Sequence, residues 1–209
     1  MQAINLSIAN ASHSLDQHIG LIHDAFERGA ASARELIGAE GIDVIFVDAP
    51  DEAIPEWGVG GYTWGPHVIL VALDPAFDLV ADKVETTLVH ELHHAMRWRG
   101  PGCGGSLAQM LVSEGLAVLF EEEVLGKAPF YSQVPITDRE VTQAIAALFV
   151  EPFSQSKWFF GADGITFGFG YTYGYQLCKA YAQAAGKRAS ELVDVPTRDV
   201  IGFDSDGAT

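Results

Sequence analysis

The stretch TTLVHELHHAMRW, residues 86–98, places three histidines and a glutamate in five consecutive positions of an otherwise apolar run. On a helix, residues four apart lie on one face, so His90 and His94 project together and can bind a single metal ion. Leu88 and Leu92 fall on the opposite side and are expected to face a core. The sequence therefore predicts a helix with one chemical face and one packing face.

The chemical face carries a metal-binding pattern. His90, Glu91 and His94 form the His-Glu-x-x-His spacing, in which two imidazoles bind zinc and the glutamate acts on the bound water. The alternative to a metal site is a solvent-exposed helix face on which the two histidines bind no metal. A metzincin would continue with a Gly at position 97 and a His at position 100, and Arg97 and Gly100 exclude that class.

A catalytic zinc needs a third protein ligand, which the sequence predicts on the next helix. Glu114 falls in the middle of an apolar stripe formed by Leu107, Met110, Leu111, Ala117 and Val118. Burying an unpaired carboxylate costs several kcal/mol, and a divalent cation would compensate its charge. A glutamate paired with Arg or Lys in the core is the alternative. Gly115 is expected to allow a close helix approach.

Apolar periodicity and turn residues predict the remaining elements. The first should be a long helix over about 15–33, followed by buried strands over 41–50 and 67–75. The Gly-rich stretch WGVGGYTWG (57–65) suggests strand pairing through a turn or bulge, with Trp57, Tyr62 and Trp64 packed on the sheet. Capping-box spacings predict helices from Asp82 to about Arg99, from Ser106 to about Leu125 before Gly126, and from Thr137. The helix from Thr137 should bury Val141, Ile145 and Leu148. A final helix is expected over 171–185.

Length and charge limit the possible organisation and partners. A chain of 209 residues suits a single domain, and a net charge of -16 disfavours nucleic acid and anionic membranes as partners. No window is apolar enough for a membrane span and no signal peptide is recognised, so a cytoplasmic protein is expected. Cys103 and Cys178 are expected to be free thiols, with one disulfide between them as the alternative. The oligomeric state stays open.

The motifs carry a family resemblance. HELHH, with Glu114 twenty residues after His94, resembles the gluzincins, the thermolysin-like metallopeptidases whose third ligand is this glutamate. SEGLA (113–117), GGYTWG (60–65) and GYTYGY (170–175) resemble, more narrowly, small bacterial proteins known as predicted zinc-dependent proteases. This resemblance spans most of residues 40–200.

The resemblance implies an α+β, zincin-like metallopeptidase fold. It implies a small, mostly antiparallel sheet whose edge strand, here 67–75, binds extended peptide, then an active-site helix and a helical C-terminal half. Within a single domain of residues 1–209, the expected parts are an N-terminal helical segment (1–40), the sheet and active-site helix (41–100) and a helical subdomain (101–201).

The chain departs from the family at one position, because Val118 stands where thermolysin has an aspartate four residues after its ligand. Glu121 and Glu122 could replace that aspartate near the metal. A solvated acidic helix end is the more ordinary expectation for Glu121, Glu122 and Glu123.

The function expected from these residues is that of a zinc-dependent peptidase acting on peptides or unfolded protein. One zinc ion held by His90, His94 and Glu114 would lower the pKa of its water to about 7, and Glu91 would act as general base. Tyr171 is the first candidate for a donor to the oxyanion and Tyr173 the second, with aromatic core packing as the alternative for both. His93 is expected to pack rather than bind metal. The alternatives are a zinc-stabilised peptide-binding protein without significant turnover, or a zinc hydrolase of a non-peptide amide.

Overall fold

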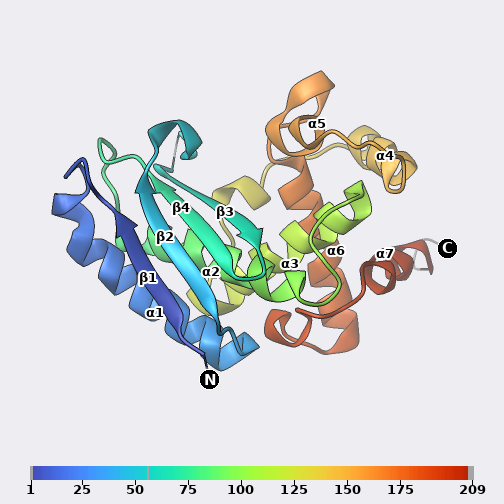
Figure 1. Cartoon of the computed structure of the whole chain (residues 1–209). Helices are drawn as coiled ribbons and strands as arrows, with labels where there is room; N and C mark the ends of the chain where they lie inside the picture. The colour runs from blue at the N-terminus through green and yellow to red at the C-terminus, as the bar shows by residue number, and fades with distance from the viewer. Residues whose placement is uncertain (1, 56, 207–209) are drawn as a thin grey trace. The chain divides into compact units, whose positions relative to one another are not determined.

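The structure, a computed structural model, describes residues 2–55 and 57–206 (Figure 1). The chain forms two compact units, Met1–Arg99 and Gly100–Thr209; the single domain inferred from length stays a prediction. The first unit contains, in chain order, β1 (Ile4–Ala9), α1 (Ile19–Ile37), β2 (Ile42–Asp48), β3 (Val59–Gly65), β4 (Val68–Leu73) and α2 (Ala81–Trp98). The second contains α3 (Leu107–Leu125), α4 (Asp138–Ala147), α5 (Gln155–Phe160), α6 (Phe169–Ala185) and α7 (Thr197–Asp206), with short 3-10 turns that include Phe130–Ser132 and Ala189–Glu191.

The sheet of the first unit has the order β1-β2-β4-β3, and it is mixed. Strand β2 runs parallel to both β1 and β4, and only β3 and β4 are antiparallel. The prediction of a mostly antiparallel sheet is therefore wrong. The reason is β1, a short alternating strand that precedes the expected first helix, because α1 then becomes the crossover that returns the chain parallel to it.

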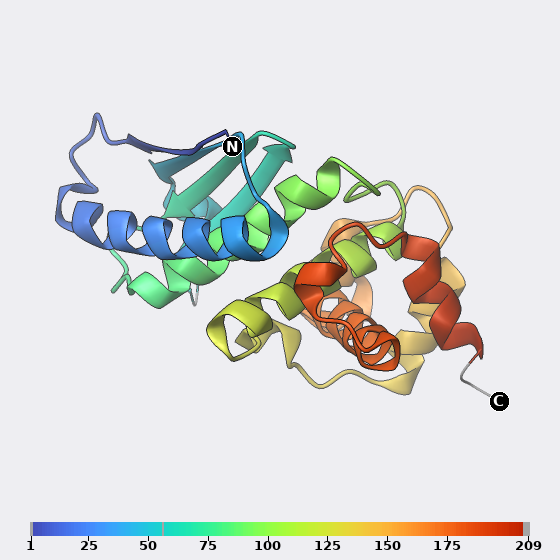
Figure 2. The ribbon, with the colours of Figure 1, turned by 90° about the horizontal axis from the view of Figure 1, so that it is seen from below.

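Both predicted strands exist, but their places in the sheet differ from expectation. The strand expected at the edge, β4, lies between β2 and β3, and the edge strands are β1 and β3. Val44, Phe46, Ile69 and Val71 are fully buried at alternate positions of β2 and β4. Helices α1 and α2 both lie on one face of the sheet (Figure 2), so these side chains form the core of the first unit.

Helix α2 carries the histidine motif and begins two residues earlier than the predicted capping box at Asp82 implied. Its N-cap is Val80, which makes no side-chain capping bond, so the capping box predicted at Asp82 is absent. From Val84 to Ala95 every residue is buried. Packing of this helix on α1 and the sheet therefore fixes its position, and its polar motif residues are held in a largely dry environment.

The second unit is helical, and most of its predicted boundaries are confirmed. Ser106 caps α3 by accepting a hydrogen bond from the Gln109 amide, and Gly126 ends the helix in the left-handed conformation. Thr137 and Glu140 form the predicted capping box of α4. The predicted buried face of α4 is only partly correct, because Ile145 is 53% exposed. Cys103 and Cys178 are not joined in a disulfide, as predicted.

None of the described helices combines the length and the apolar character that crossing a membrane requires.

The capping carboxylate Glu140 gives the first testable prediction. Burial alone would raise its pKa, but hydrogen bonds from Thr137 and Thr166 outweigh burial and lower the pKa from 4.5 to about 2. A lowered pKa stabilises the fold above pH 4.5, and this contribution is lost as the pH falls toward 2. We expect Glu140→Gln to cost about 2 kcal/mol at pH 7 and progressively less below pH 4.5.

Denaturant unfolding of the wild type and Glu140→Gln at several pH values between 2.5 and 7 measures this difference. Glu27→Gln, at an exposed position of α1, serves as the control and should show no such pH-dependent loss. A difference between wild type and Glu140→Gln that stays constant across the range would contradict the assignment.

Candidate metal centre

His90 and His94 lie one turn apart on α2, as the spacing predicts. Each side chain is 7% exposed, and the two ring centroids are 4.5 Å apart with nearly perpendicular planes, at 85°. Two imidazoles held edge to face can direct one nitrogen each toward a common point. Helix packing therefore supplies two preorganised nitrogen ligands at little further entropic cost.

Glu91 is buried beside these histidines and is held by the edge strand β3. The Thr63 hydroxyl lies 2.7 Å from Oε2 of Glu91 and 3.0 Å from its backbone oxygen, so it can donate to either acceptor. Glu91 is 6% exposed and Thr63 is 7% exposed. This contact fixes the carboxylate in a protected position next to the metal-binding face.

The glycines of β3 have a steric explanation that the sequence alone did not give. A Cβ atom at Gly61 would lie 2.6 Å from Cγ and Oε1 of Glu91 and 2.8 Å from Cγ2 of Thr87. Only glycine lets the strand come this close to the glutamate. The predicted bulge is present between Thr63 and Gly65, but Tyr62 and Trp64 are 63% and 68% exposed, so the prediction that they pack in the sheet is wrong.

Glu114 lies on α3, a helix buried along most of its length. It is 9% exposed, and its neighbours Ser113 and Gly115 are buried as well. A Cβ at Gly115 would lie 2.1 Å from the carbonyl oxygen of Gly174, and one at Gly174 would lie 2.2 Å from the carbonyl oxygen of Leu111. These two glycines allow the backbones of α3 and α6 to touch, which confirms the role expected of Gly115.

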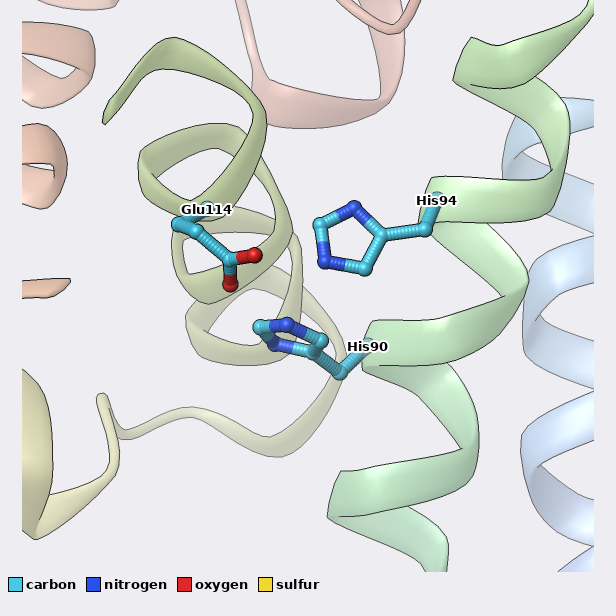
Figure 3. Close-up of side chains that lie close together, drawn as sticks. All are labelled: His90, His94 and Glu114. Carbon is cyan, nitrogen blue, oxygen red and sulfur yellow. The ribbon is translucent and has the colours of Figure 1, made fainter. Parts of the chain in front are cut away.

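Among the described residues, His90, His94 and Glu114 form a group that could hold a metal ion. Their ligand atoms all lie within 4.8 Å of one another, and Figure 3 shows the two imidazoles and the carboxylate pointing toward one another. Two nitrogen donors and one carboxylate oxygen suit zinc, and such a set leaves a fourth position for water or substrate. The donor chemistry and the burial of all three residues therefore fit the expected ion.

The two tyrosines predicted as oxyanion donors lie on α6, in different surroundings. Tyr171 is half-buried, and its ring stacks edge to face on Tyr131 and Phe159 at centroid distances of 5.0 and 5.1 Å. Tyr173 is 6% exposed and packs on Phe169 at 5.6 Å. Because residues two apart point to nearly opposite sides of a helix, at most one of them can serve a single site. Both roles stay predictions.

The acidic end of α3 corrects one expectation. The glutamates at 121–123 do not form a solvated helix end, because Glu121 is completely buried and Glu122 and Glu123 make hydrogen bonds to other elements. Tyr131, which donates a hydrogen bond to Oε1 of Glu121 at 3.0 Å, had no sequence signal. The spacing of Glu121, seven residues after Glu114, was the available clue.

The remaining histidines stay outside this group. His93 is fully buried, with its ring centroid 6.4 Å from that of His94, which agrees with the packing role expected of it. His13, His23 and His67 are exposed, and His18 is half-buried.

Comparison with known proteins supports the metal chemistry. A family model described as "Predicted Zn-dependent protease (DUF2268)" matches residues 22–202. The chain belongs to this family. No curated protein and no solved structure matched the chain. For a predicted Zn-dependent protease, a buried cluster of two histidines and a glutamate is a donor set suited to the named ion.

The ligand set predicts the effect of removing a donor. Loss of residues that merely orient metal ligands weakens binding by about 10- to 100-fold, so His94→Ala and Glu114→Gln should weaken zinc binding by more than about 100-fold. Competition with a chromophoric chelator measures the affinity. His23→Ala, an exposed histidine on α1, is the control and should bind zinc as the wild type does. Equal affinity in His94→Ala and His23→Ala would contradict the assignment.

Proposed function

We propose that the protein is a zinc-dependent peptidase of the gluzincin type, in which His90, His94 and Glu114 hold one zinc ion. The observation that carries this proposal is the buried cluster of these three side chains, with their ligand atoms within 4.8 Å of one another. Glu91 also supports the proposal, because peptide hydrolysis needs a general base. Its carboxylate lies beside the two histidines and is held at a fixed position by Thr63. Membership of a family named for predicted zinc-dependent proteolysis gives independent support.

In the proposed mechanism, His90, His94 and Glu114 would hold a zinc ion, which would act as a Lewis acid toward the scissile carbonyl and lower the pKa of the attacking water. Glu91 accepts the proton of that water and then delivers it to the leaving nitrogen. Because the Thr63 hydroxyl contacts Oε2, Oε1 is the oxygen assigned to carry the proton. Tyr171, half-buried on α6, is the first candidate to donate a hydrogen bond to the oxyanion, and Tyr173 is the second.

The substrate proposed is an extended peptide or a segment of unfolded protein, bound along β3. This strand is at the edge of the sheet, so the backbone groups on its outer side can pair with an added strand. Thr63 of β3 contacts Glu91 directly, which places the edge next to the proposed general base. The peptide-binding role first expected of the strand at 67–75 is therefore proposed for β3.

The role of Glu91 is tested by Glu91→Gln, which removes the base and keeps the shape of the side chain. We expect zinc binding to persist while cleavage of a quenched peptide library falls by about 10² to 10⁴-fold, the usual contribution of a general base. Glu85→Gln is the matched control, since Glu85 is also buried on α2 but pairs with Arg28 at 2.7 Å, and it should retain turnover.

Two outcomes would overturn the proposal in different ways. Zinc binding without cleavage by the wild type would favour a peptide-binding protein or a different amide substrate. Cleavage by Glu91→Gln at the wild-type rate would remove Glu91 from the mechanism.

The close approach of β3 to Glu91 gives a second test. Gly61→Ala should push the carboxylate aside, because the new Cβ would lie 2.6 Å from Cγ and Oε1. A displacement of about 1 Å at a reacting group can cost about 100-fold in rate, so we expect kcat/KM to fall by that order. Gly65→Ala on the same strand meets no atom within 4 Å and should leave kcat/KM unchanged. Equal activities of the two variants would contradict the proposed contact.

A further inference from the structure

The edge strand β3 presents two large aromatic side chains to solvent. Tyr62 and Trp64 are 63% and 68% exposed, whereas Thr63 between them is buried and contacts Glu91. Successive side chains of a strand point to opposite faces of a sheet. Thr63 therefore points toward α2, and the two aromatic side chains point to the other face. Trp64 lies at the bulge between Thr63 and Gly65, a feature that often redirects a side chain.

The sheet face that carries these two rings is apolar along the central strands β2 and β4. The register places Tyr62 beside Leu70 and Leu70 beside Ile45, and side chains in register lie on one face. Val47 and Val68 belong to the same face, and all four aliphatic side chains are half-buried. Helices α1 and α2 lie on the opposite face (Figure 2). The first unit therefore has an apolar surface that continues from β3 across its sheet.

The backbone of β3 can pair with a further strand on the side away from β4. The carbonyl oxygen of Gly58 accepts a hydrogen bond from the Asp74 amide, and bonded residues alternate along an antiparallel strand. Odd-numbered residues of β3 therefore direct their backbone groups away from β4. Val59 follows this rule, because its carbonyl oxygen accepts a hydrogen bond from the segment that precedes β3. By the same alternation, the backbone groups of Gly61 and Thr63 face the position of an added strand.

We propose that Tyr62 and Trp64 are specificity-determining residues, which select an extended peptide with large apolar side chains at alternate positions. The inference rests on the proposed peptidase function. A peptide paired with the outer side of β3 directs every second side chain to the face of the two rings and the others toward the side of Glu91. Apolar side chains beside aromatic ones on a neighbouring strand are favourable pairs. The net charge of -16 disfavours an acidic peptide at this position.

The test measures peptide binding without cleavage, in the zinc-loaded Glu91→Gln protein. Fluorescence anisotropy compares two labelled peptides of equal length, one alternating phenylalanine with serine and one with glutamine in place of each phenylalanine. We expect the phenylalanine peptide to bind about 10-fold more tightly. Adding Tyr62→Ser or Trp64→Ser should reduce this preference to about twofold or less, because one of the two aromatic pairs is lost. Adding Trp98→Ser, at an aromatic side chain of α2 that is 45% exposed, is the control and should preserve the preference.

Equal binding of the two peptides would overturn the inference, and so would a preference that survives both Tyr62→Ser and Trp64→Ser. A second copy of the chain is the competing occupant of this face. A dimer in light scattering that Trp64→Ser dissociates without a change in peptide binding would assign the rings to self-association instead. If the zinc-loaded wild type cleaves neither peptide while the binding preference is present, the proposed peptidase activity fails and the selectivity of the two rings stands.

Discussion

The negative charge of a carboxylate that is buried in an apolar helix must be compensated. Glu114 on α3 is such a carboxylate, and it belongs to the candidate metal site. Left uncompensated, it would cost several kcal/mol, a large part of the total stability of an ordinary domain. The neighbouring imidazoles, with ligand atoms within 4.8 Å, make a bound divalent cation the direct way to offset that cost. Much of the surrounding structure can be understood as support for this arrangement.

The support comes from residues with no direct part in metal binding. Gly115 and Gly174 let α3 and α6 touch, which fixes the helix that carries Glu114. Gly61 lets β3 lie against Glu91, and Thr63 on the same strand holds its carboxylate. A carboxylate held this way keeps its geometry without reorganising, which is what the proposed role in proton transfer would require. The same strand lies at one edge of the sheet, so Glu91 contacts an edge strand directly.

The sequence revealed the features that depend on local spacing. His90, Glu91 and His94 stand out because their spacing matches a helix, and Glu114 stands out because a charge interrupts an apolar stripe. The caps of α3 and α4 were predictable for the same reason, since a capping bond joins residues three apart. Features that depend on tertiary contacts could not be predicted from the sequence. The parallel pairing of β1 with β2 depends on the α1 crossover, and the need for glycine at 61 depends on a glutamate thirty residues later. Tyr131 has no local signal, because its hydrogen bond to Glu121 joins two separate elements of the second unit.

The most direct test of the central claim is a crystal structure of the zinc-loaded protein with anomalous diffraction collected at the zinc absorption edge. The account predicts one strong anomalous peak among His90, His94 and Glu114, at about 2.0–2.2 Å from two imidazole nitrogens and a carboxylate oxygen. A peak bound by other residues, or zinc held by the two histidines without Glu114, would contradict it.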